Sequence, residues 1–170
     1  MKKILLGILI ALFATTSSYA DAETEKSYKD AVKEFKKSKS AAPFFKNSYG
    51  YAIFPTVGKG GIGIGGSYGK GRVYVHGKYV ADTSLSQVTY GFQLGGQAFS
   101  QIMFFKNANA WSTFKTGKFE LGAQATAVAA TAGVSANADY DHGIAIFTVA
   151  KGGLMYEAAV GGQAFTYEAK

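Results

Sequence analysis

The sequence predicts an α+β protein in which N-terminal amphipathic helices precede a glycine-rich, mostly antiparallel β-barrel or sandwich. Two observations support this prediction: the composition changes near residue 48, and apolar residues then recur with a period of two between short turn-forming stretches. Residues 21–48 contain no glycine, whereas residues 49–170 contain 21 of the 22 glycines. We therefore expect three parts, a signal peptide over 1–20, a helical segment over 21–48 and a β-rich core over 49–170.

The first twenty residues have the pattern of a secretory signal peptide. A basic start at Lys2 and Lys3 precedes a largely apolar run over 4–13, and Ser18-Tyr19-Ala20 is a small-x-small cleavage pattern. Ten apolar residues are too few to span a bilayer. We therefore predict export to the periplasm with cleavage after Ala20, which leaves 16 basic and 11 acidic residues and a net charge of +5. A chain without cysteine suits that oxidising compartment.

Residues 24–39 are predicted to form a basic amphipathic helix. Its apolar residues recur at i, i+3, i+4 and i+7 and so share one face; they are Tyr28, Ala31, Val32 and Phe35. The flanks of that face are basic, and include Lys29, Lys33 and Lys36. The apolar face has two possible uses, packing on the β core or contact with a membrane through Tyr28, Val32 and Phe35. A second short helix is expected after Pro43.

From Tyr49 onward the pattern favours strands joined by tight turns. Glycine and isoleucine alternate over 61–65, a hairpin-like turn is expected at 76–78, and alternation returns over 88–95. An apolar strand at 101–105 precedes one internal helix near residues 107–116, with Asn107 as its cap and Gly117 as its end. The remaining strand candidates lie at 119–125, 134–140, 144–149 and 154–167, the last broken at 161–162.

Internal repetition supports a compact β body. Residues 50–61 return as residues 143–153, with Pro55 as the extra residue and nine of eleven aligned pairs identical. Gly-Gly-Gln-Ala-Phe occurs at both 95–99 and 161–165. This irregular spacing does not fit a solenoid. It predicts two related strand–turn–strand units set against each other, each of which presents a lysine in a glycine turn.

Two stretches of the β part resemble the SYLF domain family. One begins Tyr-Ala-Ile-Phe-Pro-Thr-Val-Gly-Lys at Tyr51 and continues as a glycine train to Gly71; the other is Tyr-Gly-Phe-Gln-Leu-Gly-Gly-Gln-Ala at 90–98. The resemblance runs from about Pro43 to Phe165. It implies lipid binding, with phosphoinositides as ligands of eukaryotic members and actin as a partner of fungal ones, and it implies that bacterial members are mostly exported.

Composition and motifs give little support to an enzyme. The chain has no cysteine and two histidines, and no pair of carboxylates stands out as an acid and base. The glycines at 61, 63 and 66 match a dinucleotide fingerprint only as a string, because a turn follows them where that site needs a helix. We therefore predict no catalytic residue, no cofactor and no metal. A charge of +5 and a periplasmic address also argue against a nucleic-acid partner.

Basic side chains in or beside glycine turns are the candidate site, because free backbone N–H groups there can bind an anion together with the side chain. Those in turns are Lys59, Lys70, Arg72 and Lys151, and those on the helix are Lys29, Lys33 and Lys36. They predict an exported peripheral protein that binds the anionic head groups of phospholipids. Two alternatives stay open. One is a small outer-membrane β-barrel. The other is a periplasmic structural or interaction protein that has no specific ligand and binds a protein partner.

Overall fold

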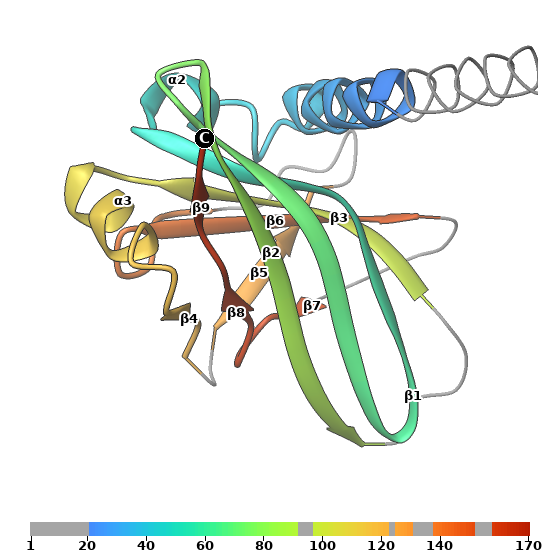
Figure 1. Ribbon diagram of the computed structural model, residues 1–170. Coiled ribbons are helices and arrows are strands. Elements are labelled where there is room, and N and C mark those ends of the chain that lie inside the picture. The colour runs from blue at the N-terminus through green and yellow to red at the C-terminus, as the bar shows by residue number, and fades with distance from the viewer. Residues whose placement is uncertain (1–20, 92–96, 123–124, 131–137, 152–157) are drawn as a thin grey trace, which may run out of the picture.

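A computed structural model of the chain describes residues 21–91, 97–122, 125–130, 138–151 and 158–170. Its strands form one curled sheet in the order β4-β8-β2-β1-β3-β6-β5-β7, and β9 pairs with β2 (Figure 1). Every pairing between these strands is antiparallel except that of β5 with β6. The α+β class and the antiparallel character are confirmed. The described strands make a curled half-barrel in place of a closed barrel or a two-sheet sandwich.

The elements of the described residues are mostly short. The helices are an N-terminal helix over 21–37, α2 (Phe44–Asn47) and α3 (Ala108–Phe114). The strands are β1 (Gly50–Val75), β2 (Lys78–Gly91), β3 (Gln97–Phe105), β4 (Phe119–Glu120), β5 (Thr126–Ala129), β6 (Ile144–Lys151), β7 (Ala158–Ala159), β8 (Ala164–Phe165) and β9 (Glu168–Ala169). Among these helices, none is long and apolar enough to cross a bilayer.

Strand β1 reverses direction along its length (Figure 1). Its first arm, residues 50–59, pairs with β3, and its second arm, residues 63–75, pairs with β2. The two arms lie close together, because a Cβ added at Gly71 would come within 2.8 Å of the backbone oxygen of Ile53. The reversal lies near Gly61, whose φ of +137° favours glycine. The glycine-rich stretch that we predicted as a simple alternating strand is therefore where the chain turns back.

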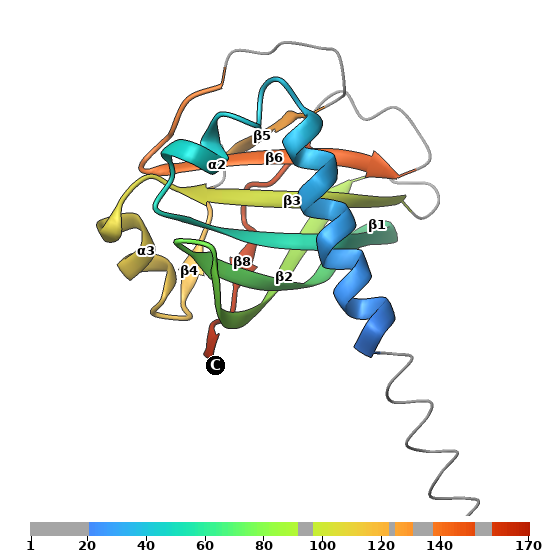
Figure 2. The ribbon, with the colours of Figure 1, turned by 90° about the horizontal axis from the view of Figure 1, so that it is seen from above.

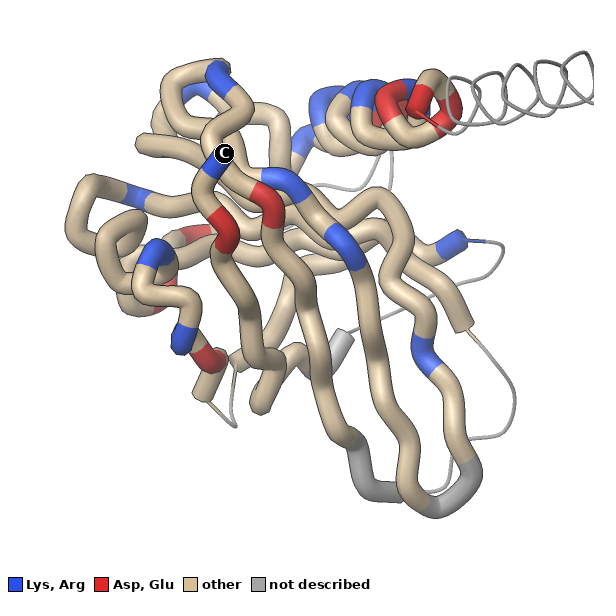
Figure 3. Tube along the Cα trace, viewed as in Figure 1, with Lys and Arg blue, Asp and Glu red and all other residues tan. Residues whose placement is uncertain are grey.

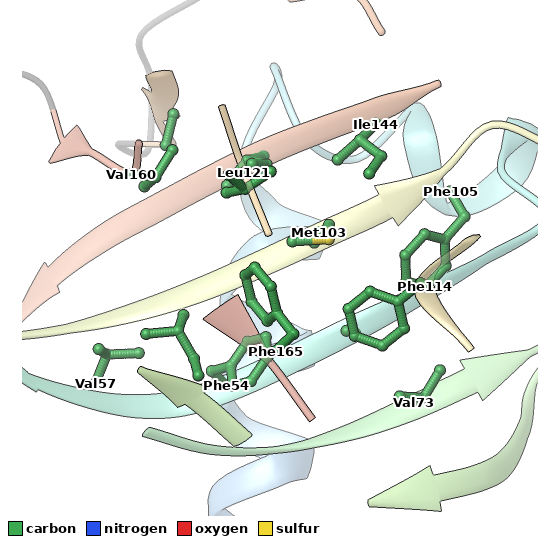
Figure 4. Packing of buried hydrophobic residues seen from close by; sticks show 14 of the residues in the cluster. Phe54, Val57, Val73, Met103, Phe105, Phe114, Leu121, Ile144, Val160 and Phe165 are labelled. Atoms are coloured by element: carbon green, nitrogen blue, oxygen red, sulfur yellow. The ribbon is translucent and has the colours of Figure 1, made fainter. Parts of the chain in front are cut away.

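Side chains of the central strands alternate between two apolar clusters, one on each face of the sheet. In β3, Ile102 and Phe104 belong to the cluster under the N-terminal helix, whereas Met103 and Phe105 belong to the cluster on the other side. We call these sides the helix face and the opposite face. Figure 4 shows part of the opposite-face cluster. Because both sides are covered, β3 is apolar at successive positions rather than at every second one.

The N-terminal helix lies across the helix face (Figure 2). Tyr28, Ala31 and Phe35 are buried, with 7%, 5% and 0% of their surfaces exposed, and they pack in one cluster with β1, β3 and β6. Val32 is partly buried against the same cluster. Of the two uses that the sequence left open for this apolar face, the structure shows packing on the sheet.

Two predicted local structures are confirmed in detail. The side chain of Asn107 accepts a hydrogen bond of 3.0 Å from the backbone N–H of Ala110 and so caps α3, and Gly117 follows the helix with a φ of +71°. His76 and Gly77 form a two-residue turn between β1 and β2 with φ values of +49° and +78°. The φ values of both turn residues are positive, as the twist of a two-residue hairpin requires.

The two copies of the sequence repeat flank β3 instead of lying directly against each other. The first arm of β1 pairs with one edge of β3 and β6 pairs with the other, so that Ile102 lies opposite both Ile53 and Phe147. Both copies are antiparallel to β3 and therefore run in the same direction. The prediction of related units in one body holds, but the central strand that separates them comes from outside the repeat.

The last third of the chain has less strand than the alternation predicts. The expected strand over 119–125 is reduced to β4, and residues 138–140 are not in a strand. The parts of the expected strands at 92–95, 123–124, 134–137 and 154–157 lie outside the described residues. The expected break at 161–162 is present as a turn between β7 and β8.

Candidate functional site

A groove of about 600 Å³ lies between the N-terminal helix and the helix face of the sheet. The helix supplies one wall, because residues spaced three or four apart along it point the same way. β1, β2 and the turn between them supply the remainder. The lining residues are Glu25, Tyr28, Lys29, Val32, Lys33 and Lys36 from the helix, and Tyr51, Arg72, Tyr74, Gly77 and Tyr79 from the sheet.

Arg72 ties the helix to the sheet at one end of the groove. Its guanidinium carbon lies 4.3 Å from the ring centre of Tyr28 and 4.6 Å from that of Tyr79. Its Nη1 donates to the Glu25 carboxylate at 2.5 Å. The Arg72 side chain is only 13% exposed, whereas that of Glu25 is 52% exposed. Stacking and partial burial therefore hold the cation in place, and its planar fork faces a single carboxylate.

Aromatic hydroxyl groups add hydrogen-bonding capacity to the groove. Burial is the largest cause that raises the pKa of Tyr28 to about 12, and the nearby charge of Arg72 opposes that rise. Burial likewise raises the pKa values of Tyr51 and Tyr79 to about 12, and at Tyr79 a hydrogen bond with Asp82 adds to the effect. At neutral pH the three phenols keep their protons. They therefore carry no negative charge that would repel an anion. Tyr28 and Tyr51 can donate hydrogen bonds to it, whereas the Tyr79 hydroxyl already donates to Asp82.

The groove has more positive than negative charge. Four cations line it, three helix lysines and Arg72, against the single carboxylate of Glu25. Lys36 lies 5.4 Å from the ring centre of Phe45. Lys29 and Lys33 are exposed and form no salt bridge with any residue that the structure describes. The positive potential at this wall is thus available to a ligand from solution. Figure 3 shows the basic residues along the helix and on the neighbouring strands.

The structure brings most of the predicted site residues to one side of the molecule. Six of them line the groove: Tyr28, Lys29, Val32, Lys33, Lys36 and Arg72. Lys70 precedes Arg72 by two residues on the same arm and is exposed on the same face. Lys151 follows Val149, which packs on the helix face, by two residues, and its Nζ donates to Thr56 Oγ1 at 2.9 Å. Both lie outside the groove.

Two predicted site residues lie elsewhere. Lys59 comes two residues after Val57, which belongs to the opposite-face cluster, so strand alternation directs Lys59 away from the helix. Phe35 is completely buried beneath the helix and does not line the groove. A membrane contact through Phe35 would require the helix to leave the sheet.

Sequence reasoning missed the aromatic floor of the groove. Tyr74 and Tyr79 are paired across the hairpin, and Tyr51 stacks on Tyr74 with ring centres 5.2 Å apart. The pairing of Tyr74 with Tyr79 follows from the turn at 76–77, which the sequence did predict. The position of Tyr51 depends on the reversal of β1, for which the sequence offered only a glycine-rich stretch. Glu25 gave no signal, because its partner is 47 residues away.

The described residues contain no group of three or more histidine, cysteine, aspartate or glutamate side chains placed to hold a metal ion. The acidic pair Asp139 and Asp141 lies at a turn where Asp141 forms a bridge with Ile144. The imidazole of His142 contacts the carboxylate of its neighbour Asp141, and both side chains are exposed.

Comparison with known proteins gives two similarities. A family model described as "Ysc84: Las17-binding protein actin regulator" matches residues 86–170, half of the chain. The chain is also 26% identical over 136 residues to Beta cell expansion factor A of Aeromonas veronii, an alignment that covers 79% of this chain. The chain spans about half the length of that relative, 51%. All residues that line the groove precede the matched segment 86–170.

Proposed function

The chain belongs to the Ysc84 family, the SYLF domain family that its glycine-rich stretches resemble, and on that premise we propose that it is an exported peripheral protein that binds anionic phospholipids. The resemblance implies lipid binding, and the family model is described by its binding of Las17 and by actin regulation. The leader-like pattern of residues 1–20 supports a periplasmic address. The proposed role is binding, and it involves no catalytic step.

The observation that carries the proposal is the gathering of cations and phenols around one groove. Arginine and lysine are the usual partners of phosphate groups, and protonated tyrosines add neutral donors beside them. The volume of about 600 Å³ falls in the range of small-molecule sites. A phosphate with part of its glycerol or sugar head group fits this chemistry: the helix lysines attract the charge and the tyrosine floor contacts the less polar part.

Two further cations on the helix face support a model in which this face of the protein is turned toward the membrane. Lys70 and Lys151 share that face with the helix lysines, so all of these cations can approach one anionic surface together. Each basic residue near such a surface contributes about 1 kcal/mol, and salt screens the attraction. Binding through these contacts should therefore be reversible and sensitive to ionic strength. The lysines of the helix meet the surface, while its apolar side chains stay on the sheet.

Co-sedimentation with vesicles tests this function. The purified protein is mixed with vesicles of equimolar phosphatidylglycerol and phosphatidylcholine, or of phosphatidylcholine alone, at low and high salt. We expect binding to the anionic vesicles only, and loss of binding at high salt. The double variant Lys33→Gln/Lys36→Gln should bind about thirtyfold more weakly at low salt, because it loses about 2 kcal/mol of attraction.

A matched control has the same change in net charge on another part of the molecule. Lys115 and Lys118 are exposed at the end of α3, whose Phe114 packs on the opposite face. The double variant Lys115→Gln/Lys118→Gln should keep most of its binding. Equal losses in the two double variants would mean that net charge, and not the groove, determines binding. No binding of the unmodified protein to either vesicle would refute the proposal and favour a protein partner.

A further inference from the structure

The far end of the β1–β2 pair exposes three large apolar side chains. Ile64, Tyr68 and Val88 are 66%, 55% and 64% exposed. Among the described residues, these are the large hydrophobic side chains that are exposed to solvent. Gly66 pairs with Val88, so all three side chains fall on one side of the paired strands. This end of the pair projects beyond the rest of the sheet (Figure 1). We call these three side chains the apolar tip.

At the apolar tip, apolar side chains are exposed and polar side chains are buried, which is the reverse of the arrangement expected in water. Ser67 and Gln87, which pair with each other and point to the other side, are buried. The Ser67 hydroxyl has no hydrogen-bond partner among the described residues, and the Gln87 amide donates to the backbone oxygen of Gly161 at 2.9 Å. A strand with one face in water normally puts its polar residues there. Polar residues inside and large apolar residues outside indicate that the tip meets a less polar surrounding than water.

The residues next to the tip indicate which surrounding that is. Along the second arm of β1 the same face carries Ile64, then Tyr68, and then the cations Lys70 and Arg72. An apolar residue, an aromatic residue and a cation in this order match the depth profile of an anionic membrane, in which acyl chains give way to the interface and to charged head groups. Arg72 also lines the groove, so the tip and the groove face the same way.

We propose that the apolar tip inserts into the outer part of an anionic phospholipid leaflet while the groove and its lysines hold head groups. This inference rests on the proposed function and adds a second mode of attachment to it. One weak signal gives only marginal membrane binding, whereas an apolar insertion combined with a basic surface gives stable attachment. The tip side chains are already exposed, so their insertion requires no rearrangement of the sheet.

Because the chain has no cysteine, a single introduced thiol can report the depth of a chosen position. We would label the variants Ile64→Cys and Val88→Cys with an environment-sensitive fluorophore, and use Lys115→Cys as the control. Each is mixed with vesicles of equimolar phosphatidylglycerol and phosphatidylcholine that carry quenchers in their acyl chains. We expect a blue shift and strong quenching at positions 64 and 88, and neither at position 115.

A second set of variants measures what the tip contributes to affinity. Ile64→Ser/Val88→Ser should weaken binding to the same vesicles at least about tenfold, since it removes two exposed apolar side chains. The conservative pair Ile64→Val/Val88→Ile should retain binding. The circular dichroism spectra of both pairs should match that of the unmodified protein, because neither position is buried.

The outcomes separate this inference from the proposed function. Vesicle binding with labels 64 and 88 still in water would overturn insertion of the tip and leave head-group binding in place. Failure of the unmodified protein to bind would overturn both. If the serine pair bound as tightly as the unmodified protein, the tip would have no part in attachment.

Discussion

At the scale of single residues, glycine decides how closely the two arms of β1 can approach. A Cβ at Gly71 would lie 2.5 Å from the Phe54 ring and 2.8 Å from the backbone oxygen of Ile53. Phe54 is itself fully buried in the opposite-face cluster and has little room to move. By contrast, a Cβ at Gly58, on the first arm, would meet no atom within 4 Å. Two glycines of one strand therefore have different roles.

This contrast gives a prediction for two alanine substitutions. Gly71→Ala should lower the free energy of unfolding by about 1–3 kcal/mol, because the new methyl group overpacks the core. Gly58→Ala should change it by no more than about 0.5 kcal/mol. Urea denaturation followed by circular dichroism measures both. Similar values for the two variants would show that the arms do not lie as close together as the structure places them.

At the same scale, Arg72 shows why the candidate site is a property of the fold. The sequence marks this residue only as a cation beside a glycine turn. In the structure it stacks on Tyr28 and Tyr79 and bonds Glu25, and so it joins the β1–β2 hairpin to the N-terminal helix, where Glu25 lies 47 residues earlier in the chain. Its surroundings, more than its charge alone, make it part of the groove.

At the scale of elements, the N-terminal helix has two sides with separate tasks. Its apolar side completes a core, since Phe35 has no exposed surface and packs with Ile102, Phe104 and Phe147. Its basic side forms the wall of the groove. Helix packing therefore fixes the orientation of the lysines, and an amphipathic helix that looks free to lie on a membrane is held to the protein instead.

Truncation of one buried ring tests this assignment of the helix. Phe35→Ala should lower the free energy of unfolding by about 3–5 kcal/mol, through lost burial and the cavity that remains. Lys37→Ala, at an exposed position of the same helix, should change it by less than about 0.5 kcal/mol. Chemical denaturation at neutral pH gives both numbers. A Phe35→Ala value as small as that of the lysine variant would mean that the helix is not part of the folded core.

At the scale of the whole molecule, contacts between distant segments hold the curled sheet in shape. The side-chain amides of Gln101 on β3 and Gln163 before β8 exchange two hydrogen bonds of 2.8 and 3.0 Å. Both residues have no exposed surface. This pair fastens the last segment of the chain to the middle of the sheet. Its effect extends to the first arm of β1, because Phe165, two residues further on, packs against Phe54.

A double-mutant cycle measures the interaction energy between Gln101 and Gln163. Gln101→Leu or Gln163→Leu alone should each cost about 1–3 kcal/mol, because each leaves the other amide buried without its partner. The double variant should cost clearly less than the sum of the two. Thermal or urea unfolding of the four proteins gives the coupling energy. Strict additivity would show that the two amides do not depend on each other for their hydrogen bonds.

The sequence alone determined the features that depend on neighbouring residues. The N-terminal helix, predicted over 24–39 and found over 21–37, follows from local spacing. The Asn107 cap of α3, the turn at 76–77 and the antiparallel β character likewise follow from local spacing and turn chemistry, which act over a few residues. The family resemblance also came from contiguous motifs. The predictions of a signal peptide and of phospholipid binding likewise rest on local patterns, and they stay predictions.

Tertiary structure alone decided which of these parts meet. The reversal of β1 at Gly61 places Tyr51 beside Tyr74, and the burial of Phe35 turns the helix lysines toward Arg72. The tertiary structure also places Lys59 on the face opposite the other predicted cations, and it leaves Ile64, Tyr68 and Val88 exposed to solvent. The physical reason is that a period of two identifies the two faces of a strand but not what covers each face. What covers each face depends on how distant segments pack, and the groove forms only where the N-terminal helix packs on the sheet.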